Sequence, residues 1–174
     1  SVVMGILLTM PTSSAAIWIA IASGSTSDAM MLAGGAAVVG CAAQMVGFAV
    51  MTFKENGVGG LISQGIGTSM LQIPNIMKHP LIFVPPIIAS AIVGPIATCV
   101  FKLRCTAGGG GMGTSGLVGV FGAVEASKGV VSDANIALGI VFLMFVIPAV
   151  VSLLFRILFE KKGWIKGEWM KLDV

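Results

Sequence analysis

The chain has 174 residues, of which 56% are hydrophobic and 10% charged, and its mean hydropathy is +1.03. Soluble domains carry about 25% charged residues, so this composition excludes a water-soluble globular protein and indicates an integral membrane protein. The net charge of +3 gathers at the ends of apolar segments and near the C-terminus, which is typical of membrane orientation. We therefore expect contact with membrane lipid and no nucleic-acid partner.

The length of the apolar runs predicts an all-α, polytopic transmembrane fold. Leu81 to Phe101 and Ala134 to Phe159 are long runs made almost entirely of apolar residues, and about 20 apolar residues cross a bilayer as a helix. The strands of a membrane barrel would instead alternate apolar and polar residues with a period of two. We therefore divide the chain into a transmembrane domain, residues 1–159, and a C-terminal tail, residues 160–174.

The first apolar segment, Val2 to Ala22, is long enough to span but carries Pro11 and several hydroxyl residues near its middle. Because proline removes a backbone hydrogen bond, we expect a kinked or broken helix there. The next segment, Ala29 to Phe53, is uninterrupted until Lys54.

Small residues recur along this second segment at steps of four, three and four: Ala36, Gly40, Ala43 and Gly47. They form one stripe on which a neighbouring helix can approach closely. Gln44 borders the stripe, and its amide forms either an interhelical hydrogen bond or a contact with a ligand.

Two glycine-rich segments, Gly57 to Met77 and Cys105 to Ser127, lie on either side of the run that begins at Leu81. Each contains a Gly-x-Gly-Thr-Ser element, at residues 65–69 and 111–115. Glycine runs cannot form a straight lipid-facing helix cheaply, so we expect both segments to be broken near these elements and covered by protein or water.

The two elements place flexible backbone and free N–H groups beside small hydroxyls, which suits hydrogen bonding to a sugar-like or anionic solute. Glycines that merely permit tight helix packing are the alternative. The residues that we predict to contact a solute carry hydroxyl, amide, carboxylate or free backbone groups: Gly67, Thr68, Ser69, Gln72, Asn75, Gly113, Thr114, Ser115 and Glu125.

Glu125 is the acidic residue of this set, and its burial would be costly unless it faces a cavity or a partner. An ion pair with Lys128 at the membrane boundary is the alternative. Residues 111–116 also match the dinucleotide pattern G-x-G-x-x-G, but no strand precedes them, so we expect no nucleotide cofactor. The three cysteines lack metal-ligand spacing, so we expect no metal, and no residue suggests a catalytic role.

Two topologies fit the charges. If both glycine-rich segments span the membrane, then Lys54, Lys102, Arg104 and the tail are cytoplasmic, whereas Lys78 and Lys128 lie outside. If both are re-entrant hairpins, one enters from each side and the tail is again cytoplasmic, as in transporters whose discontinuous elements meet near the midplane. We favour the hairpins, although the positive-inside rule alone favours the first arrangement.

The tail combines two tryptophans with charges of both signs, which predicts that it lies at the cytoplasmic headgroup level. A regulatory contact with a cytosolic partner is the alternative.

Four strings, at residues 41–50, 65–76, 111–119 and 161–165, together resemble the enzyme IIC-like membrane proteins of the bacterial phosphotransferase system, in the branch that includes the perfringolysin regulator. The resemblance covers nearly the whole chain. Members of that branch are longer, and this chain is similar to their C-terminal half, so the missing N-terminal half is an expected partner of any complete site.

The resemblance implies a sugar permease subunit in the bacterial plasma membrane that hands its substrate to a phosphorylated cytosolic enzyme IIB. The sequence contains no soluble IIA or IIB module, because its histidine adjoins a membrane segment and no cysteine sits in a soluble domain. Sugar phosphorylation would therefore require separate IIA and IIB partners. A homodimer is also consistent with the resemblance, and a membrane sensor or regulator on a permease scaffold is the alternative function.

Overall fold

The computed structural model describes residues 1–25 and 27–172. Within these residues, three helical stretches are long and apolar enough to cross a membrane. They are α3 (Asp28–Met51), α6 (Val84–Cys99) with a short turn (Pro80–Phe83) before it, and a continuous stretch of α8 (Asp133–Ile140), a π-helical segment (Val141–Val146) and α9 (Ile147–Lys161). No strand occurs in the described ranges, apart from an isolated bridge between Lys128 and Val131. The prediction of an all-α membrane protein is confirmed.

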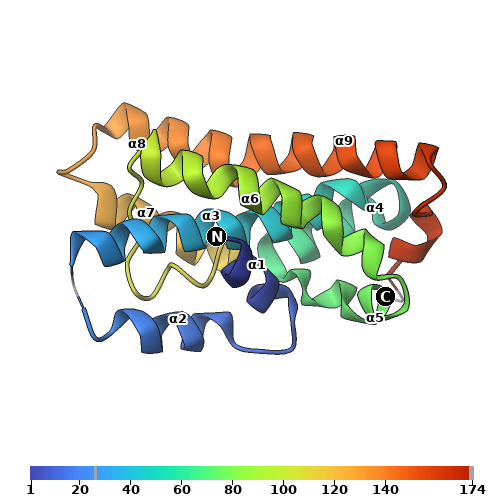
Figure 1. The fold of residues 1–174 in the computed structure, drawn as a ribbon, viewed down its shortest axis with the longest axis horizontal. Coiled ribbons are helices and arrows are strands. Elements are labelled where there is room, and N and C mark those ends of the chain that lie inside the picture. The colour runs from blue at the N-terminus through green and yellow to red at the C-terminus, as the bar shows by residue number, and fades with distance from the viewer. Residues whose placement is uncertain (26, 173–174) are drawn as a thin grey trace.

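Helix α3 lies at the centre of the bundle (Figure 1). It packs against α6, α9 and the N-terminal helix α1 (Val2–Thr9), and most of its residues are buried. A Cβ atom at Gly47 would lie 2.6 Å from Ser152 Oγ on α9 and 3.1 Å from Pro86 Cβ on α6. Gly47, one member of the predicted small-residue stripe, therefore lies where α6 and α9 both approach α3 closely.

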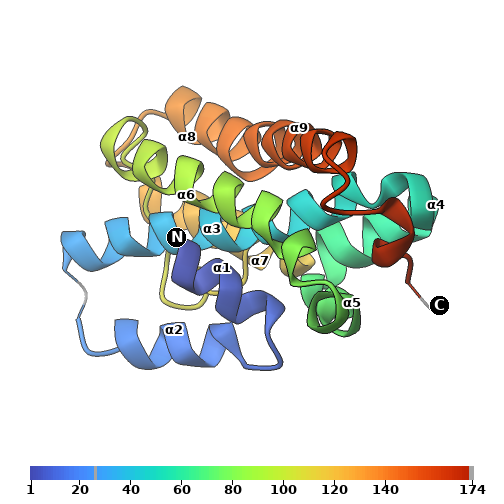
Figure 2. The same cartoon turned by 45° about the vertical axis from the view of Figure 1, so that its right-hand side comes forward.

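The first apolar segment is broken, as the sequence predicts. Helix α1 ends at Thr9, and α2 (Ser14–Ala22) begins after the loop that contains Pro11. The hydroxyl of Ser13 caps α2 by accepting a hydrogen bond from the N–H of Ala16. Figure 2 shows α1 close to the middle of the bundle and α2 along its lower edge.

The first glycine-rich segment folds as a hairpin, which we call the first hairpin (residues 53–78). It consists of α4 (Phe53–Ile62), a π-helical turn (Ser63–Gly67), a 3-10 turn (Ser69–Gln72) and α5 (Ile73–Lys78). Thr68 is extended, with φ −160° and ψ 141°, so the helix is broken inside the Gly-x-Gly-Thr-Ser element. The hairpin leaves the end of α3 and returns to the same end of the bundle, where α6 begins (Figure 1).

The second hairpin (residues 102–127) starts at the opposite end, where α6 stops and α8 begins (Figure 1). Residues 102–114 form no regular helix, and α7 (Val118–Ser127) follows a short 3-10 turn at Ser115–Leu117. The hydroxyl of Ser127 closes the hairpin, because it accepts a hydrogen bond from the Arg104 N–H at 2.9 Å and donates one to the Arg104 carbonyl at 3.2 Å. This segment too is interrupted beside its Gly-x-Gly-Thr-Ser element.

The two ends of the bundle differ in charge. The end that carries the tail holds most of the basic residues of the described ranges: Lys54, Lys78, Arg156, Lys161, Lys162, Lys166 and Lys171. The other end holds Lys102, Arg104 and Lys128, and it also holds three acidic residues, Asp28, Glu125 and Asp133. The positive excess of the chain is therefore concentrated at the tail end.

The tail packs against the bundle. Ile165 and Met170 are 1% and 0% exposed, and they belong to an apolar cluster with Phe48 of α3 and Phe159 of α9. The Trp169 ring stacks on His79 with ring centroids 3.9 Å apart. Trp164 is 49% exposed and packs edge-to-face on Phe159 with ring centroids 5.3 Å apart. The expected position of the two tryptophans at the headgroup level stays a prediction.

Candidate functional site

The two Gly-x-Gly-Thr-Ser elements meet in the middle of the bundle, at a contact that we call the junction. The hydroxyl of Thr114 donates a hydrogen bond to the Gly65 carbonyl at 2.5 Å, and the hydroxyl of Ser115 donates one to the Gly67 carbonyl at 3.0 Å. Hairpins that start from opposite ends of the bundle are thus joined at their tips through side-chain hydroxyls and backbone carbonyls.

Local backbone geometry orients the hydroxyls and carbonyls of the junction toward each other. The extended conformation at Thr68 ends the π-helical turn, and the Thr68 hydroxyl accepts a hydrogen bond from the Met70 N–H at 3.1 Å to begin the next turn. In the second hairpin, Gly113 has φ +57°, a left-handed conformation that glycine adopts at little steric cost. The chain reverses there and presents Thr114 to the first hairpin.

The break between α1 and α2 joins the same region. Thr9 and Ser69 share a hydrogen bond between their hydroxyls at 2.8 Å, and the Ser14 hydroxyl donates one to the Gly111 carbonyl at 2.7 Å. The sequence predictions did not include Thr9 and Ser14. A signal was present, because hydroxyl residues flank Pro11 just as they follow the glycines of the two elements.

The junction has one accessible side. Gly67 and Gly116 are exposed, and Thr68 and Ser115 are half buried, whereas Ser69 and Thr114 are 0% exposed. A polar solute that reached this side would meet hydroxyls and carbonyls that already bond to one another. Since these bonds are between short side chains and backbone, a small separation of the two tips would free both donors and acceptors for a solute.

A second polar cluster, the amide network, lies between the first hairpin and the tail. The amide of Gln72 donates hydrogen bonds to Gln64 Oε1 and to the Met170 carbonyl, both at 3.0 Å. Asn75 donates to Gln72 Oε1 at 2.9 Å and to the Lys171 carbonyl at 3.0 Å. The side-chain amides of the first hairpin therefore hold the backbone of the tail.

The structure separates the nine predicted solute-binding residues into three places. Six of them lie at the junction: Gly67, Thr68, Ser69, Gly113, Thr114 and Ser115. Gln72 and Asn75 belong to the amide network. Glu125 is exposed near the end of α7, and in the described residues no hydrogen bond joins it to the others. The predicted role of all nine in solute binding stays a prediction.

Gln44 is 0% exposed in α3, and neither polar atom of its side chain has a hydrogen-bond partner among the described residues. The interhelical bond to the backbone is made by Ser90 instead, whose hydroxyl donates to the Gly40 carbonyl at 3.2 Å. Of the two sequence-based alternatives for Gln44, a contact with a ligand is the one that would satisfy its amide, since a buried amide without partners is costly.

Replacing Gln44 by methionine is expected to raise the free energy of unfolding by about 1 kcal/mol, because it removes a buried polar group that lacks partners. Gln64 is the matched control: it is equally buried but bonds to Thr52, Gly60 and Gln72, so Gln64→Met should cost about 2 kcal/mol. Unfolding in mixed micelles measures both. Equal losses in the two variants would contradict the assignment of Gln44 as unpartnered.

The described residues contain no group of three or more His, Cys, Asp or Glu side chains that could hold a metal ion. The polar groups at the junction and in the amide network are hydroxyls, amides and carbonyls, which are neutral donors and acceptors. This inventory suits the recognition of an uncharged, hydroxyl-rich molecule.

The chain matches the family described as phosphotransferase system, EIIC, over residues 1–172. It belongs to the phosphotransferase system EIIC family. Comparison with curated proteins and with solved structures gave no match. Family membership and the apolar helical stretches together identify this EIIC-family chain as a permease-like membrane protein. The resemblance inferred from the four sequence strings is therefore confirmed at the level of the family, whereas the branch of the perfringolysin regulator stays a prediction.

Proposed function

We propose that the chain is the sugar-translocating membrane subunit of a bacterial phosphotransferase system. The observation that carries the proposal is the junction, where hairpins from opposite ends of an EIIC-family bundle meet through hydroxyls and carbonyls. Discontinuous elements of opposite direction that meet near the midplane form the solute sites of many transporters. Separate cytosolic IIA and IIB proteins would supply the phosphoryl group.

In this proposal both hairpins are re-entrant, and the tail end of the bundle is cytoplasmic. Seven of the ten Lys and Arg residues lie at that end, and cytoplasmic loops carry the excess of basic residues. The arrangement also leaves the second hairpin on the outer side. Its two arms are joined there by the hydrogen bonds of Ser127, and the ion pair of Arg104 with Asp28 joins the hairpin to the start of α3.

Lys78 distinguishes the two topologies. With re-entrant hairpins, Lys78→Cys in a Cys99→Ser background should react with membrane-impermeant maleimide only after the cells are opened. Lys128→Cys should react in sealed cells and Lys162→Cys only in opened ones under either topology, so these variants calibrate the assay. Labelling of Lys78→Cys in sealed cells would show that the first glycine-rich segment crosses the membrane.

Transport is tested in right-side-out vesicles loaded with phosphoenolpyruvate and a cytosolic extract, and supplied outside with labelled hexoses, hexitols and pentitols. We expect labelled sugar phosphate to accumulate for one of these classes only when the chain is present. Thr68→Val and Ser115→Ala should lower the rate about fivefold to tenfold, because each removes a hydrogen bond to the solute. Thr98→Val, at the far end of α6, should leave it unchanged.

Glu125 is tested in the same vesicles. If its carboxylate accepts hydroxyls of the solute, Glu125→Gln should weaken uptake far more than Lys128→Gln. Both side chains are exposed, but an ammonium group cannot accept a hydrogen bond from a hydroxyl. Equal rates in the two variants would remove Glu125 from the solute site.

A sensor or regulator on the same scaffold is the second candidate, and the amide network is the observation that favours it. The tail carbonyls accept hydrogen bonds from Gln72 and Asn75, so the tail is coupled directly to a hairpin that reaches the junction. Under this alternative, binding of sugar to the purified chain should occur without accumulation of sugar or sugar phosphate in the vesicles.

A further inference from the structure

An apolar groove runs along the side of the bundle between α3, the first hairpin and α9. It consists of two adjoining cavities of about 590 and 410 Å³, which share Val50 and Leu61. Its walls include Val46 on α3, Ile62 on α4 and Leu153 on α9. In a bilayer this side faces lipid, because large apolar side chains around the groove are exposed.

The length of the groove matches one leaflet. Its apolar lining on the last helical stretch extends from Phe145 to Ile157, which is about 18 Å at 1.5 Å per residue, and the polar Glu160 follows one turn later. Half of the hydrocarbon core of a bilayer is about 15 Å. The groove thus begins near the middle of the bundle, beside Gly65, and ends at the tail end.

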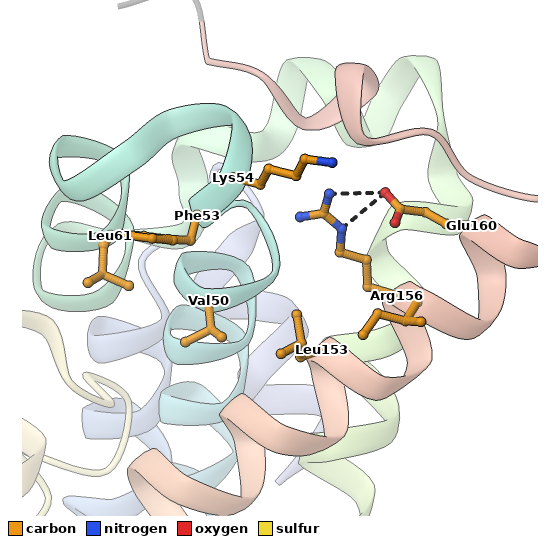
Figure 3. A pocket seen from close by; sticks show the side chains of 8 residues that line it. Val50, Phe53, Lys54, Leu61, Leu153, Arg156 and Glu160 are labelled. Atoms are coloured by element: carbon orange, nitrogen blue, oxygen red, sulfur yellow. Dashed lines mark hydrogen bonds and ion pairs between the residues drawn. The ribbon is translucent and has the colours of Figure 1, made fainter.

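Charged groups of both signs stand at the tail end of the groove (Figure 3). Arg156 bonds to Glu55 and to Glu160, so this trio carries one net negative charge. The side chain of Glu160 is 34% exposed, and only its Oε1 accepts hydrogen bonds within the described ranges. Lys54 extends toward Glu160 in Figure 3 and forms no salt bridge among the described residues.

We propose that the groove binds one phospholipid with a primary ammonium headgroup, of the phosphatidylethanolamine class. An acyl chain fills the apolar groove, the lipid phosphate lies at Lys54, and the ammonium donates hydrogen bonds to the free side of the Glu160 carboxylate. The groups at the rim sum to zero net charge, which complements a zwitterion. Phosphatidylcholine lacks the N–H donors, and phosphatidylglycerol lacks the cation.

Native mass spectrometry of the full chain in detergent tests this, with phosphatidylethanolamine, phosphatidylglycerol and phosphatidylcholine of identical acyl chains added in equal amounts. We expect one phosphatidylethanolamine per chain, retained about fivefold more than either competitor. Lys54→Gln should lower this retention about fivefold, whereas Lys161→Gln, at the same end but outside the groove, should not. Glu160→Gln should abolish the preference for ethanolamine.

The groove itself is tested with a matched pair on α9. Ala149→Phe places a ring in the groove and should lower retention of all three lipids, whereas Val150→Phe, one residue later and outside the lining, should leave it unchanged. Equal retention of the three lipids by the parent, or equal behaviour of the Ala149 and Val150 variants, would overturn the proposal. A dimer that Ala149→Phe dissociates would overturn it too, because the occupant would then be a second copy of the chain.

Discussion

Replacing Gly113 by alanine is expected to destabilise the protein by about 3 kcal/mol. The left-handed φ of +57° costs an alanine about 1 kcal/mol. The added Cβ would lie 2.7 Å from Ala42 N and 2.7 Å from Cys41 C, and overpacking of this kind adds about 2 kcal/mol. Because both of those atoms are backbone of the central helix α3, they cannot move aside cheaply.

Gly116 is the matched control. It also has a positive φ, +52°, but the nearest atom to its Cβ position is a side-chain carbon of Val118 at 3.8 Å. Gly116→Ala should therefore cost only the conformational term, about 1 kcal/mol. The free energies of unfolding of the two variants, measured in mixed micelles, differ by the contribution of packing between the second hairpin and α3. Equal losses of stability in the two variants would show that the close approach of Gly113 to α3 is not important for stability.

Arg156→Gln is expected to cost about 3–5 kcal/mol, because it leaves the Glu55 carboxylate without its partner in a largely buried position. The side chains of Arg156 and Glu55 are 5% and 12% exposed, and the guanidinium bonds to both Glu55 oxygens, at 2.9 and 2.5 Å. This pair fixes α9 to α4, so its loss should also loosen the first hairpin.

Adding Glu55→Gln to Arg156→Gln should recover about 2 kcal/mol, since the unpaired charge is then gone. The pair Arg104 and Asp28 provides the comparison. Asp28 is 65% exposed, so Arg104→Gln should cost less than Arg156→Gln, because the carboxylate that loses its partner stays solvated by water. A double variant no more stable than Arg156→Gln alone would show that burial of the pair is not what makes it important.

The spanning helices were predictable because bilayer thickness alone sets the length of an apolar run. The break near Pro11 and the interruptions at the two Gly-x-Gly-Thr-Ser elements were predictable as well. Proline lacks a backbone N–H donor and glycine has a flexible backbone, and both properties act on the helix at the residue itself. Hydroxyl content marked the residues of the junction. It did not reveal that Thr114 and Ser115 take their acceptors from Gly65 and Gly67, because every carbonyl looks alike in a sequence.

The same limit explains the amide network. Gln72 and Asn75 were predicted as solute contacts from their side chains, but the carbonyls that they bond belong to the tail, which was expected at the membrane surface. The side chain of Glu125 was expected to face a cavity inside the protein, because it lies in a polar segment. It is exposed instead, because its position on α7 points it away from the bundle. The pairing of Arg156 with Glu55 spans 101 positions, and no local pattern encodes it.

The docking of the tail has a consequence for biosynthesis. The hydrogen bond from Gln72 to the Met170 carbonyl joins residues 98 positions apart, and that from Asn56 to the same carbonyl spans 114. At about 5–20 residues per second, the ribosome adds Met170 seconds after it has added Gln72. The amides of Asn56 and Gln72 must therefore be solvated by water, or shielded by the insertion machinery, until Met170 has been synthesised. The first hairpin can reach its final hydrogen bonding only after that point.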